Sequence, residues 1–267
     1  MKSLLGAFLL LAGLGAAQAQ TRPAFLPEAA LRVCTDPGFA PMEFFRNPGD
    51  AQAVGFDMDL ATALAARWGV PFRLQSSDFK GLLPGVDSGR CDMAISGMLV
   101  TEARKQRYDA VPYLGTHVVL MAARANAEVN KPEDLSGKVL AVEGGSNYEN
   151  VAAKLNETLR AAGKPLVTVQ TYPTPTAITE QVLLGRAAAA MTQDVEAAFR
   201  DQQLPGKLRI AYTYPETDRF GIYLKRDPAA LAALREAIAA LRADGTIAKL
   251  AAKWNIPETD VKLDDPS

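Results

Sequence analysis

The segment AISGMLVTEARK (94–105) holds the residue types that could bind a carboxylate. Its apolar run reaches Ser96-Gly97, as at a strand end, and Thr101 stands three residues before Arg104. Threonine is a preferred N-cap, so we expect a helix to begin after Thr101, with Arg104 in its first turn. Free backbone N–H groups and a planar guanidinium there would receive both oxygens of a carboxylate. The alternative is a solvent-exposed arginine on a surface helix.

Other polar residues favour structural roles over catalysis. Asp57 and Asp59 could form a catalytic carboxylate pair, but their place at the start of a predicted helix favours capping and dipole compensation. EGGSN (143–147) lacks the lysine and the spacing of a phosphate-binding loop. His117 is the only histidine, so a His-based metal cluster is excluded, and we expect no metal and no cofactor.

The N-terminus is typical of a secretory signal. Lys2 precedes an apolar stretch over 4–14, and Ala17-Gln18-Ala19 fits a small-x-small cleavage site, so we expect a periplasmic protein cleaved near Ala19. No cysteine follows that site, and no later stretch is long and apolar enough to span a bilayer, so we expect no membrane anchor. A net charge of −1 without a basic stripe argues against nucleic acid.

Short β-rich runs alternate with helical patterns along the chain. The predicted strands are 31–35, 71–75, 91–96, 117–123, 138–142, 166–171, 187–192, 208–212 and 220–225. The predicted helices are 56–69, 147–162, 175–184, 194–203, 228–242 and 245–254. This alternation predicts an α/β fold with mainly parallel sheets flanked by helices.

Two of the predicted strands suggest a division into two lobes. HVVLMAA (117–123) and FGIYLK (220–225) bracket about a hundred residues that carry their own βα series. If both segments cross between lobes, lobe 1 is 20–116 plus 217–267 and lobe 2 is 117–216, joined by a two-strand hinge. Open α/β sheets bind ligands at the carboxyl ends of their strands, so we expect the ligand in the cleft between the lobes.

The two cysteines leave two interpretations open. Cys34 and Cys91 each lie in a predicted strand, and an oxidising compartment would permit a disulfide between them. The alternative is a pair of separate small core residues, because an offset between the strands could hold their Cα atoms beyond about 7 Å.

Seven motifs in a fixed order carry a resemblance to a known family. They are LRVCTDPGFAPMEF (31–44), GFDMDLATALA (55–65), DFKGLLPGVDSGRCDMAISGM (78–98), TEARKQRYD (101–109), KPEDLSGKVLAVEGGSNYE (131–149), TQDVEAAF (192–199) and LRADGTIAKLAAKW (241–254). Over the mature length the chain resembles the periplasmic solute-binding proteins, polar amino acid branch, that serve ABC importers. The resemblance implies a monomer that closes over an L-α-amino acid and is then recognised by a membrane permease.

The resemblance also implies roles for individual residues. It implies ring contacts from Phe39 and Phe79, and a carboxylate bond to Arg104. From the second lobe, it implies that Ser146 offers a hydroxyl and that Asp194 receives the α-ammonium. The remaining ligand-binding residues that it implies are Ser96, Gly97, Leu99 and Asn147. A zwitterion tolerates burial only if both charges meet partners, which agrees with this arrangement.

Two positions depart from the family pattern, and two rival functions stay open. Leu99 stands where the family usually has Thr or Ser, and Asn147 where it often has Thr, which leaves the ligand's side chain undetermined. The first rival is an exported cyclohexadienyl or arogenate dehydratase, a class that resembles the same fold; Glu143 would then be a candidate general acid. The second is a sensory module in which closure signals to a receptor.

Overall fold

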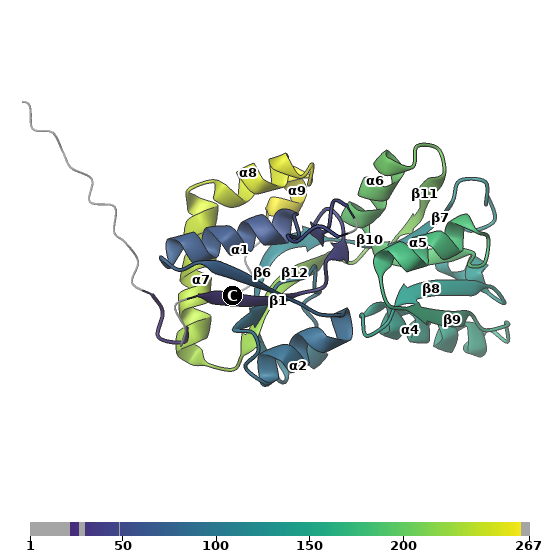
Figure 1. The fold of residues 1–267 in the computed structure, drawn as a ribbon. Coiled ribbons are helices and arrows are strands. Elements are labelled where there is room, and N and C mark those ends of the chain that lie inside the picture. Colours follow the sequence, from purple (N-terminus) through teal and green to yellow (C-terminus); the bar gives the residue numbers. More distant parts are fainter. Residues whose placement is uncertain (1–21, 27–29, 48, 263–267) are drawn as a thin grey trace, which may run out of the picture.

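The alternating β and α segments build two five-stranded sheets that lie side by side (Figure 1). The structure is a computed structural model that describes residues 22–26, 30–47 and 49–262. The expected signal peptide, residues 1–19, lies outside the described residues. Each sheet forms a lobe with the helices that cover it, and this confirms the two-lobed α/β fold.

Lobe 1 is built on the sheet with strand order β4-β1-β5-β12-β6. Its strands are β1 (Leu31–Thr35), β4 (Phe72–Ser76), β5 (Met93–Ala94), β6 (Tyr108–Thr116) and β12 (Asp218–Lys225). Its helices are α1 (Phe56–Arg67), α2 (Leu82–Asp87), α3 (Glu102–Lys105), α7 (Pro228–Ala243), α8 (Thr246–Lys253) and α9 (Glu258–Val261). Strand β1 is parallel to β4 and β5, whereas β12 is antiparallel to β5 and β6. A small antiparallel pair, β2 (Gly38–Phe39) and β3 (Glu43–Phe44), follows β1.

Lobe 2 is built on the sheet with strand order β11-β7-β10-β8-β9. Its strands are β7 (Val118–Ala123), β8 (Val139–Glu143), β9 (Thr168–Tyr172), β10 (Ala189–Gln193) and β11 (Leu208–Thr213). Its helices are α4 (Tyr148–Ala161), α5 (Pro175–Leu183) and α6 (Asp194–Gln203). Strands β8, β9 and β10 run parallel, and β7 is antiparallel to β10 and β11. Single turns of 3-10 helix, Phe79–Gly81 in lobe 1 and Pro132–Leu135 in lobe 2, complete the elements.

The chain passes between the sheets at two places. Strand β6 ends at Thr116 and β7 begins at Val118, while β11 ends at Thr213 and β12 begins at Asp218. We therefore propose that the boundaries between the lobes lie in these two connections, between residues 116 and 117 and between residues 216 and 217. His117 lies in the first of these connections.

Local sequence signals explain where several helices begin. The Thr101 side chain accepts a hydrogen bond from the Arg104 backbone N–H, as a threonine N-cap should. Thr174 caps α5 in the same way, and Asp227 accepts from two N–H groups of α7. Burial of apolar faces between sheets and helices then stabilises the lobes.

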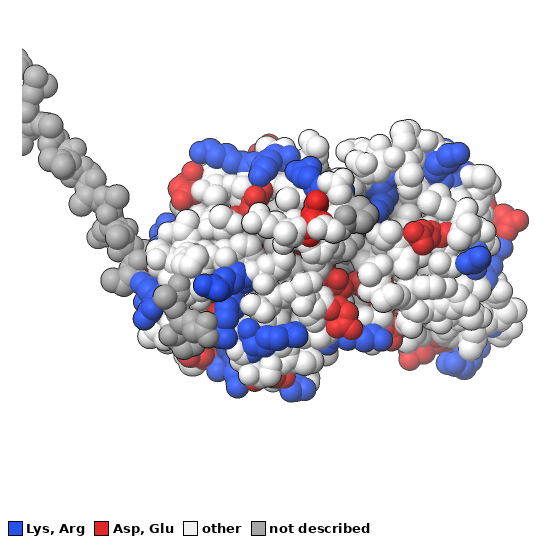
Figure 2. Space-filling view, viewed as in Figure 1, with Lys and Arg blue, Asp and Glu red and all other residues white. Residues whose placement is uncertain are grey.

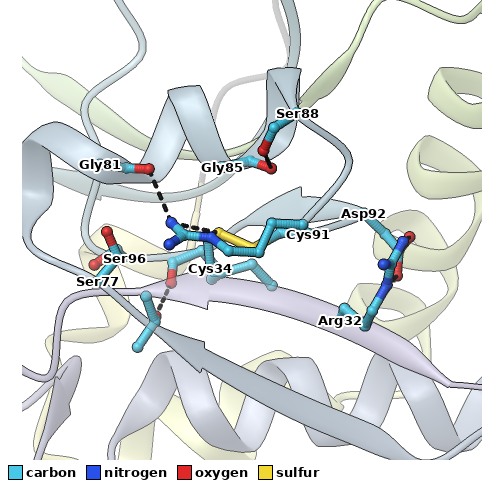
Figure 3. The surroundings of a disulfide bond; sticks show 12 residues. Arg32, Cys34, Ser77, Gly81, Gly85, Ser88, Cys91, Asp92 and Ser96 are labelled. Carbon is cyan, nitrogen blue, oxygen red and sulfur yellow. Dashed lines mark hydrogen bonds and ion pairs between the residues drawn. A yellow bond between two sulfur atoms is a disulfide. The ribbon is translucent and has the colours of Figure 1, made fainter.

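A disulfide joins Cys34 of β1 to Cys91, just before β5, with a Cα–Cα distance of 5.6 Å. Of the two interpretations left open by the sequence, the structure has the bonded one. The bond lies between β1 and the helix that carries Gly85, and the Arg32–Asp92 ion pair lies at the other end of β1 (Figure 3). Two covalently linked strands therefore lead to the cleft, because β1 is followed by Asp36 and β5 by Ser96.

Candidate functional site

A cleft between the lobes collects most of the residues that could bind a ligand. From lobe 1 it is lined by Asp36, Phe39, Glu43, Phe79, Ser96, Gly97, Leu99 and Arg104. From lobe 2 it is lined by Glu143, Ser146, Asn147, Tyr148 and Gln193. Acidic side chains are visible where the lobes meet on the face in view (Figure 2). The lobes touch across the cleft, since Arg104 Nη2 donates to the Gly145 carbonyl at 3.5 Å.

The cleft floor is held from behind by two buried carboxyl groups. The Gly97 N–H donates to Asp57 Oδ2 at 2.8 Å, and Ser96 Oγ donates to Glu43 Oε1 at 2.9 Å. Burial raises the pKa of Asp57 to about 6, and burial with repulsion from Asp57 raises the pKa of Glu43 well above its usual range. Of the two carboxyls, Glu43 therefore holds its proton more strongly than an ordinary glutamate, and its hydrogen-bonded neighbour Asp57 is the better placed to carry the charge. Asp57 and Asp59 do lie in the first turn of α1, where a negative charge complements the helix dipole. The expectation that Asp57 caps this helix is wrong, because its carboxylate bonds Gly97 and Tyr113 and no side chain caps α1.

Gly97 is required at the floor by its conformation and its neighbour. Its φ is +48°, in the left-handed region that favours glycine. A Cβ at this position would lie 2.6 Å from the Phe39 ring. Phe39 and Gly97 are thus packed so closely that the ring and the floor form one surface of the cleft.

Arg104 is fixed by contacts to the chain that precedes it. Its Nη1 donates to the Leu99 carbonyl at 2.8 Å, and Tyr223 donates to the same oxygen at 2.6 Å. The guanidinium lies 5.5 Å from the centre of the Phe79 ring, within cation–π range. Burial lowers the pKa of Arg104 from its ordinary value, yet guanidinium stays protonated in proteins. The cleft therefore holds a preoriented, partly desolvated positive charge.

Two carboxyl groups from opposite lobes lie in the same cleft. Asp36 follows β1, and Glu143 ends β8. Burial raises the pKa of Asp36 to about 6, and Asp36 Oδ2 has no hydrogen-bond partner among the described residues. Burial, with repulsion from Asp36 next in size, raises the pKa of Glu143 well above its usual range. The two carboxyls repel each other across the cleft, and a cation between them would relieve that repulsion.

The start of α4 closes the cleft from lobe 2. Ser146, Asn147 and Tyr148 line the cleft from the turn that begins this 14-residue helix. Its first-turn N–H groups and the positive end of its dipole favour an anion at this end of the cleft. Tyr148 also donates a hydrogen bond to Gln193 Oε1, so these two buried side chains hold each other in place.

The structure brings together all of the expected ligand-binding residues except one. Phe39, Phe79, Ser96, Gly97, Leu99, Arg104, Ser146 and Asn147 all line the cleft. Asp194 is placed elsewhere, in a separate pocket behind the hinge. Its carboxylate accepts hydrogen bonds from Thr116 Oγ1 at 2.8 Å and from the Val195 N–H at 2.8 Å, and it lies 3.2 Å from His117 Nδ1. The residue that β10 presents to the cleft is Gln193.

Sequence reasoning did not assign Asp36, Tyr148 or Gln193 to the cleft. A usable signal existed for Asp36, which directly follows the predicted strand 31–35, because the carboxyl ends of parallel strands meet at one sheet edge. The same signal applies to Glu143, named only as a candidate acid. Gln193 required the register of β10 to within one residue, which its run of small residues does not define.

With this geometry in view, comparisons with known proteins identify the family. Residues 31–257 match the bacterial extracellular solute-binding proteins, family 3. The chain belongs to this family. It is 32% identical to the lysine/arginine/ornithine-binding periplasmic protein of Escherichia coli (strain K12) over 263 residues, 95% of this chain and 97% of that protein.

Solved structures agree with the family assignment. An ancestral arginine-binding protein bound to arginine superposes with a TM-score of 0.78 at 30% identity, covering 85% of this chain and 98% of that one. The ancestral amino acid-binding protein AncCDT-1, a precursor of cyclohexadienyl dehydratase, superposes with a TM-score of 0.76 at 27% identity, covering 85% and 95%. The relatives named here are binding proteins.

The described part of the chain contains neither a membrane-spanning helix nor a cluster of metal-ligating side chains. No helix there has the length and apolar character needed to cross a membrane. Across residues 22–26, 30–47 and 49–262, no group of three His, Cys, Asp or Glu side chains is arranged to hold a metal ion.

Proposed function

We propose that this protein is the substrate-binding component of an amino acid ABC importer and that its ligand is an L-α-amino acid with a cationic side chain. The observation that carries the proposal is the placement of Asp36 and Glu143, from opposite lobes, in the cleft that also holds Arg104. One end of the cleft suits a carboxylate, and the carboxyls suit a cation. The names of the relatives, which include arginine- and lysine-binding proteins, support this substrate class.

The anionic end of the ligand would meet Arg104 and the start of α4. A guanidinium binds both carboxylate oxygens in parallel, and unpaired N–H groups at a helix N-terminus add to the attraction. Ser146 offers a hydroxyl at the same place, although its Oγ already donates to the Glu143 carbonyl at 2.6 Å. Because Arg104 and α4 belong to different lobes, a carboxylate bound by both would favour closure.

The cationic side chain would lie between Asp36 and Glu143. Without it, closure brings two buried carboxyls together: burial raises the pKa of both, and repulsion from Asp36 raises the pKa of Glu143 further. With it, both carboxyls can ionise and pair, so closure and cation binding favour each other. The ligand's α-ammonium would find Gln193 and Glu143 as acceptors in the cleft, since Asp194 is turned to the hinge.

The remaining features of the proposal follow from family membership. Relatives carry periplasmic or extracellular descriptions, and we place this protein in the periplasm, cleaved near Ala19 and without an anchor. We further propose that it acts as a monomer and that the closed form docks on an inner-membrane permease. A permease encoded beside this chain would favour transport over a sensory role.

The test is a binding panel on protein freed of carried-over ligand by unfolding and refolding. We expect arginine, lysine or ornithine to raise the melting temperature by roughly 8–16 °C at 1,000 times the Kd, equivalent to about 4 kcal/mol. Citrulline is the matched control, because it replaces the guanidinium of arginine by a neutral group of similar shape. We expect it to bind at least ~30-fold more weakly, since it leaves Asp36 and Glu143 without a cation. Tighter binding of citrulline or glutamate than of arginine would contradict the cationic substrate.

A dehydratase remains a second candidate, because Glu143 is a buried carboxyl in the cleft with a raised pKa, as a general acid requires. The similarity to AncCDT-1 also supports a direct test of dehydratase activity. Incubation with prephenate or arogenate, followed for phenylpyruvate or phenylalanine, measures the activity directly. We expect no product above the uncatalysed rate. Turnover that is lost in Glu143→Gln would establish the enzyme instead.

A further inference from the structure

A second pocket lies between the lobes, away from the cleft residues. From lobe 2 it is lined by residues of α6, among them Asp194, Ala198 and Phe199, and from lobe 1 by Trp254 and Asp260. In Figure 1, α6 and the pair α8 and α9 stand on either side of the gap between the lobes. The cavity measures about 180 Å³. Since a cavity of about 150 Å³ holds benzene, a molecule of one ring and a short substituent would fit.

The walls of this pocket are largely apolar. Phe199 and Trp254 both contact Phe44, at ring-centre distances of 5.5 and 5.9 Å, so three aromatic rings bridge the lobes beside it. Ile210, a large apolar side chain that is 43% exposed, also lines the pocket. Such walls suit a hydrocarbon body.

One carboxyl group in the pocket has an oxygen that is buried without a hydrogen-bond partner among the described residues. Asp260 is 7% exposed, and its Oδ2 makes no hydrogen bond to any described residue. Its Oδ1 accepts only a 3.3 Å bond from the neighbouring Thr259 hydroxyl. A carboxylate that is buried without a partner has lost its hydration and has gained no hydrogen bond in return, which is unfavourable. A cationic group bound here would pair with it and offset that loss.

The surrounding charges also favour a cation. Asp194 lines the same pocket from the opposite lobe and repels Asp260, while His117 attracts it. Within the ranges that the structure describes, no lysine or arginine lines the pocket. Two cations already lie on the Trp254 ring, outside the pocket lining: Lys253, 5.3 Å from the ring centre and paired with Asp59 at 2.7 Å, and Arg46, 5.6 Å from the ring centre. The pocket therefore combines two carboxyl groups with aromatic walls, and none of the described residues that line it is a lysine or an arginine.

We propose that this pocket is a second ligand site, separate from the amino-acid cleft, that binds a small organic ammonium ion with an aromatic or branched apolar body. The ammonium would pair with Asp260 and lie near Asp194, and the body would pack against Phe199 and Trp254. A ligand here would contact α6 of lobe 2 and α9 of lobe 1 at once. Binding at this second site does not depend on which amino acid the cleft binds.

The test uses Trp254 as a local reporter. The chain has two tryptophans, so Trp68→Phe leaves Trp254 as the only one. We expect benzylamine to change its emission saturably, with a Kd in the millimolar range, and benzyl alcohol, which lacks the charge, to bind at least ~10-fold more weakly. Asp260→Asn should weaken benzylamine by at least ~10-fold, while Glu258→Gln, on the exposed side of the same helix, should leave it unchanged.

A variant on the opposite wall keeps the proposal testable if Asp260→Asn fails to fold. Ala198→Leu extends an exposed position of α6 into the pocket without touching Asp260 and should abolish the saturable change. The proposal is overturned if benzylamine produces no saturable signal up to about 50 mM. It is equally overturned if benzyl alcohol binds as well as benzylamine, or if binding survives Ala198→Leu.

Discussion

Gln193 and Asp194 are consecutive in the chain, yet Gln193 lines the cleft and Asp194 lines the pocket behind the hinge. The strand β10 ends between them, and Asp194 starts α6. This one-residue difference decides which group is available to the ligand: a neutral amide, where the resemblance implied a carboxylate. It also gives Asp194 a different set of partners, Thr116 and His117, at the crossing between the lobes.

Substitutions at these two positions should therefore have unequal effects on ligand affinity. We expect Gln193→Ala to weaken arginine binding by about tenfold, because it removes a buried hydrogen-bonding group and its support of Tyr148. Asp194→Asn should change the Kd less than ~3-fold, since its carboxylate lies outside the cleft. Titration calorimetry measures both, with Arg104→Ala as the positive reference at ~30-fold or more. The reverse order would return Asp194 to the ligand site.

The affinity for a cationic ligand should depend on pH through Asp36. Its pKa is raised to about 6 by burial, so below pH 6 it must lose a proton before it can pair with the ligand. The Kd for arginine should fall as the pH rises from 5 to 7, by up to about tenfold per unit below pH 6. The pKa of Glu143 is also raised, so its ionisation should likewise lower the Kd for arginine as the pH rises.

The control for that pH profile is Asp36→Asn. It should bind arginine more weakly at pH 7 and show a shallower dependence, because one titrating group is gone. A wild-type Kd that stays constant between pH 5 and 7 would mean that neither carboxyl changes its protonation when the ligand binds.

The fold was largely predictable from the sequence, and the elements that the prediction missed have local causes. The alternation of apolar strand runs and capped helical patterns located β1 and α6 with their observed ends, and placed the elements of lobe 2 within two residues. The prediction missed β6 (Tyr108–Thr116), which contains Pro112 and Gly115, residues that argue against a strand. Its partner β12 pairs with it along its length, so tertiary pairing overrides the local preference.

The candidate site was predictable where one local motif builds it and unpredictable where distant segments meet. Thr101 and Arg104 needed only the geometry of one helical turn. Asp57 accepts a hydrogen bond from the backbone of Gly97, 40 residues later in the chain, and no local sequence pattern predicts this long-range contact. Tyr148 and Gln193 likewise meet only because α4 begins, and β10 ends, at the same edge of lobe 2.

The buried pair behind the cleft floor should make stability fall as the pH rises. Glu43 and Asp57 have raised pKa values in the folded state, so between their ordinary and folded pKa values the native protein binds more protons than the unfolded chain. Their contribution to the free energy of unfolding is full below about pH 4 and declines above it, by about 1.4 kcal/mol per unit for each group that stays protonated only when folded. Urea unfolding at pH 5 and pH 8 measures this decline.

Glu43→Gln isolates the contribution of one member of the pair. Glutamine can still accept from Ser96 and offers an N–H to the neighbouring Asp57 carboxylate, so stability at pH 5 should change little. The decline between pH 5 and 8 should be smaller than in the wild type, because glutamine has no proton to lose. Glu102→Gln, on the surface of α3, is the matched control and should keep the wild-type profile. An unchanged profile in Glu43→Gln would place the titrating proton elsewhere.

The Cys34–Cys91 disulfide should matter for stability more than for ligand affinity. It closes a loop with a sequence separation of 57, which corresponds to ~4 kcal/mol in the chain-entropy model, so reduction should lower the melting temperature by roughly 8–16 °C. The Kd for arginine should change less than ~3-fold, because the β1–β5 ladder and the bond from the Asp36 N–H to Ser96 Oγ still align the cleft residues. The double variant Cys34→Ala, Cys91→Ala should melt like the reduced protein and be indifferent to dithiothreitol. A large loss of affinity on reduction would instead mean that the bond itself positions Asp36 and Ser96.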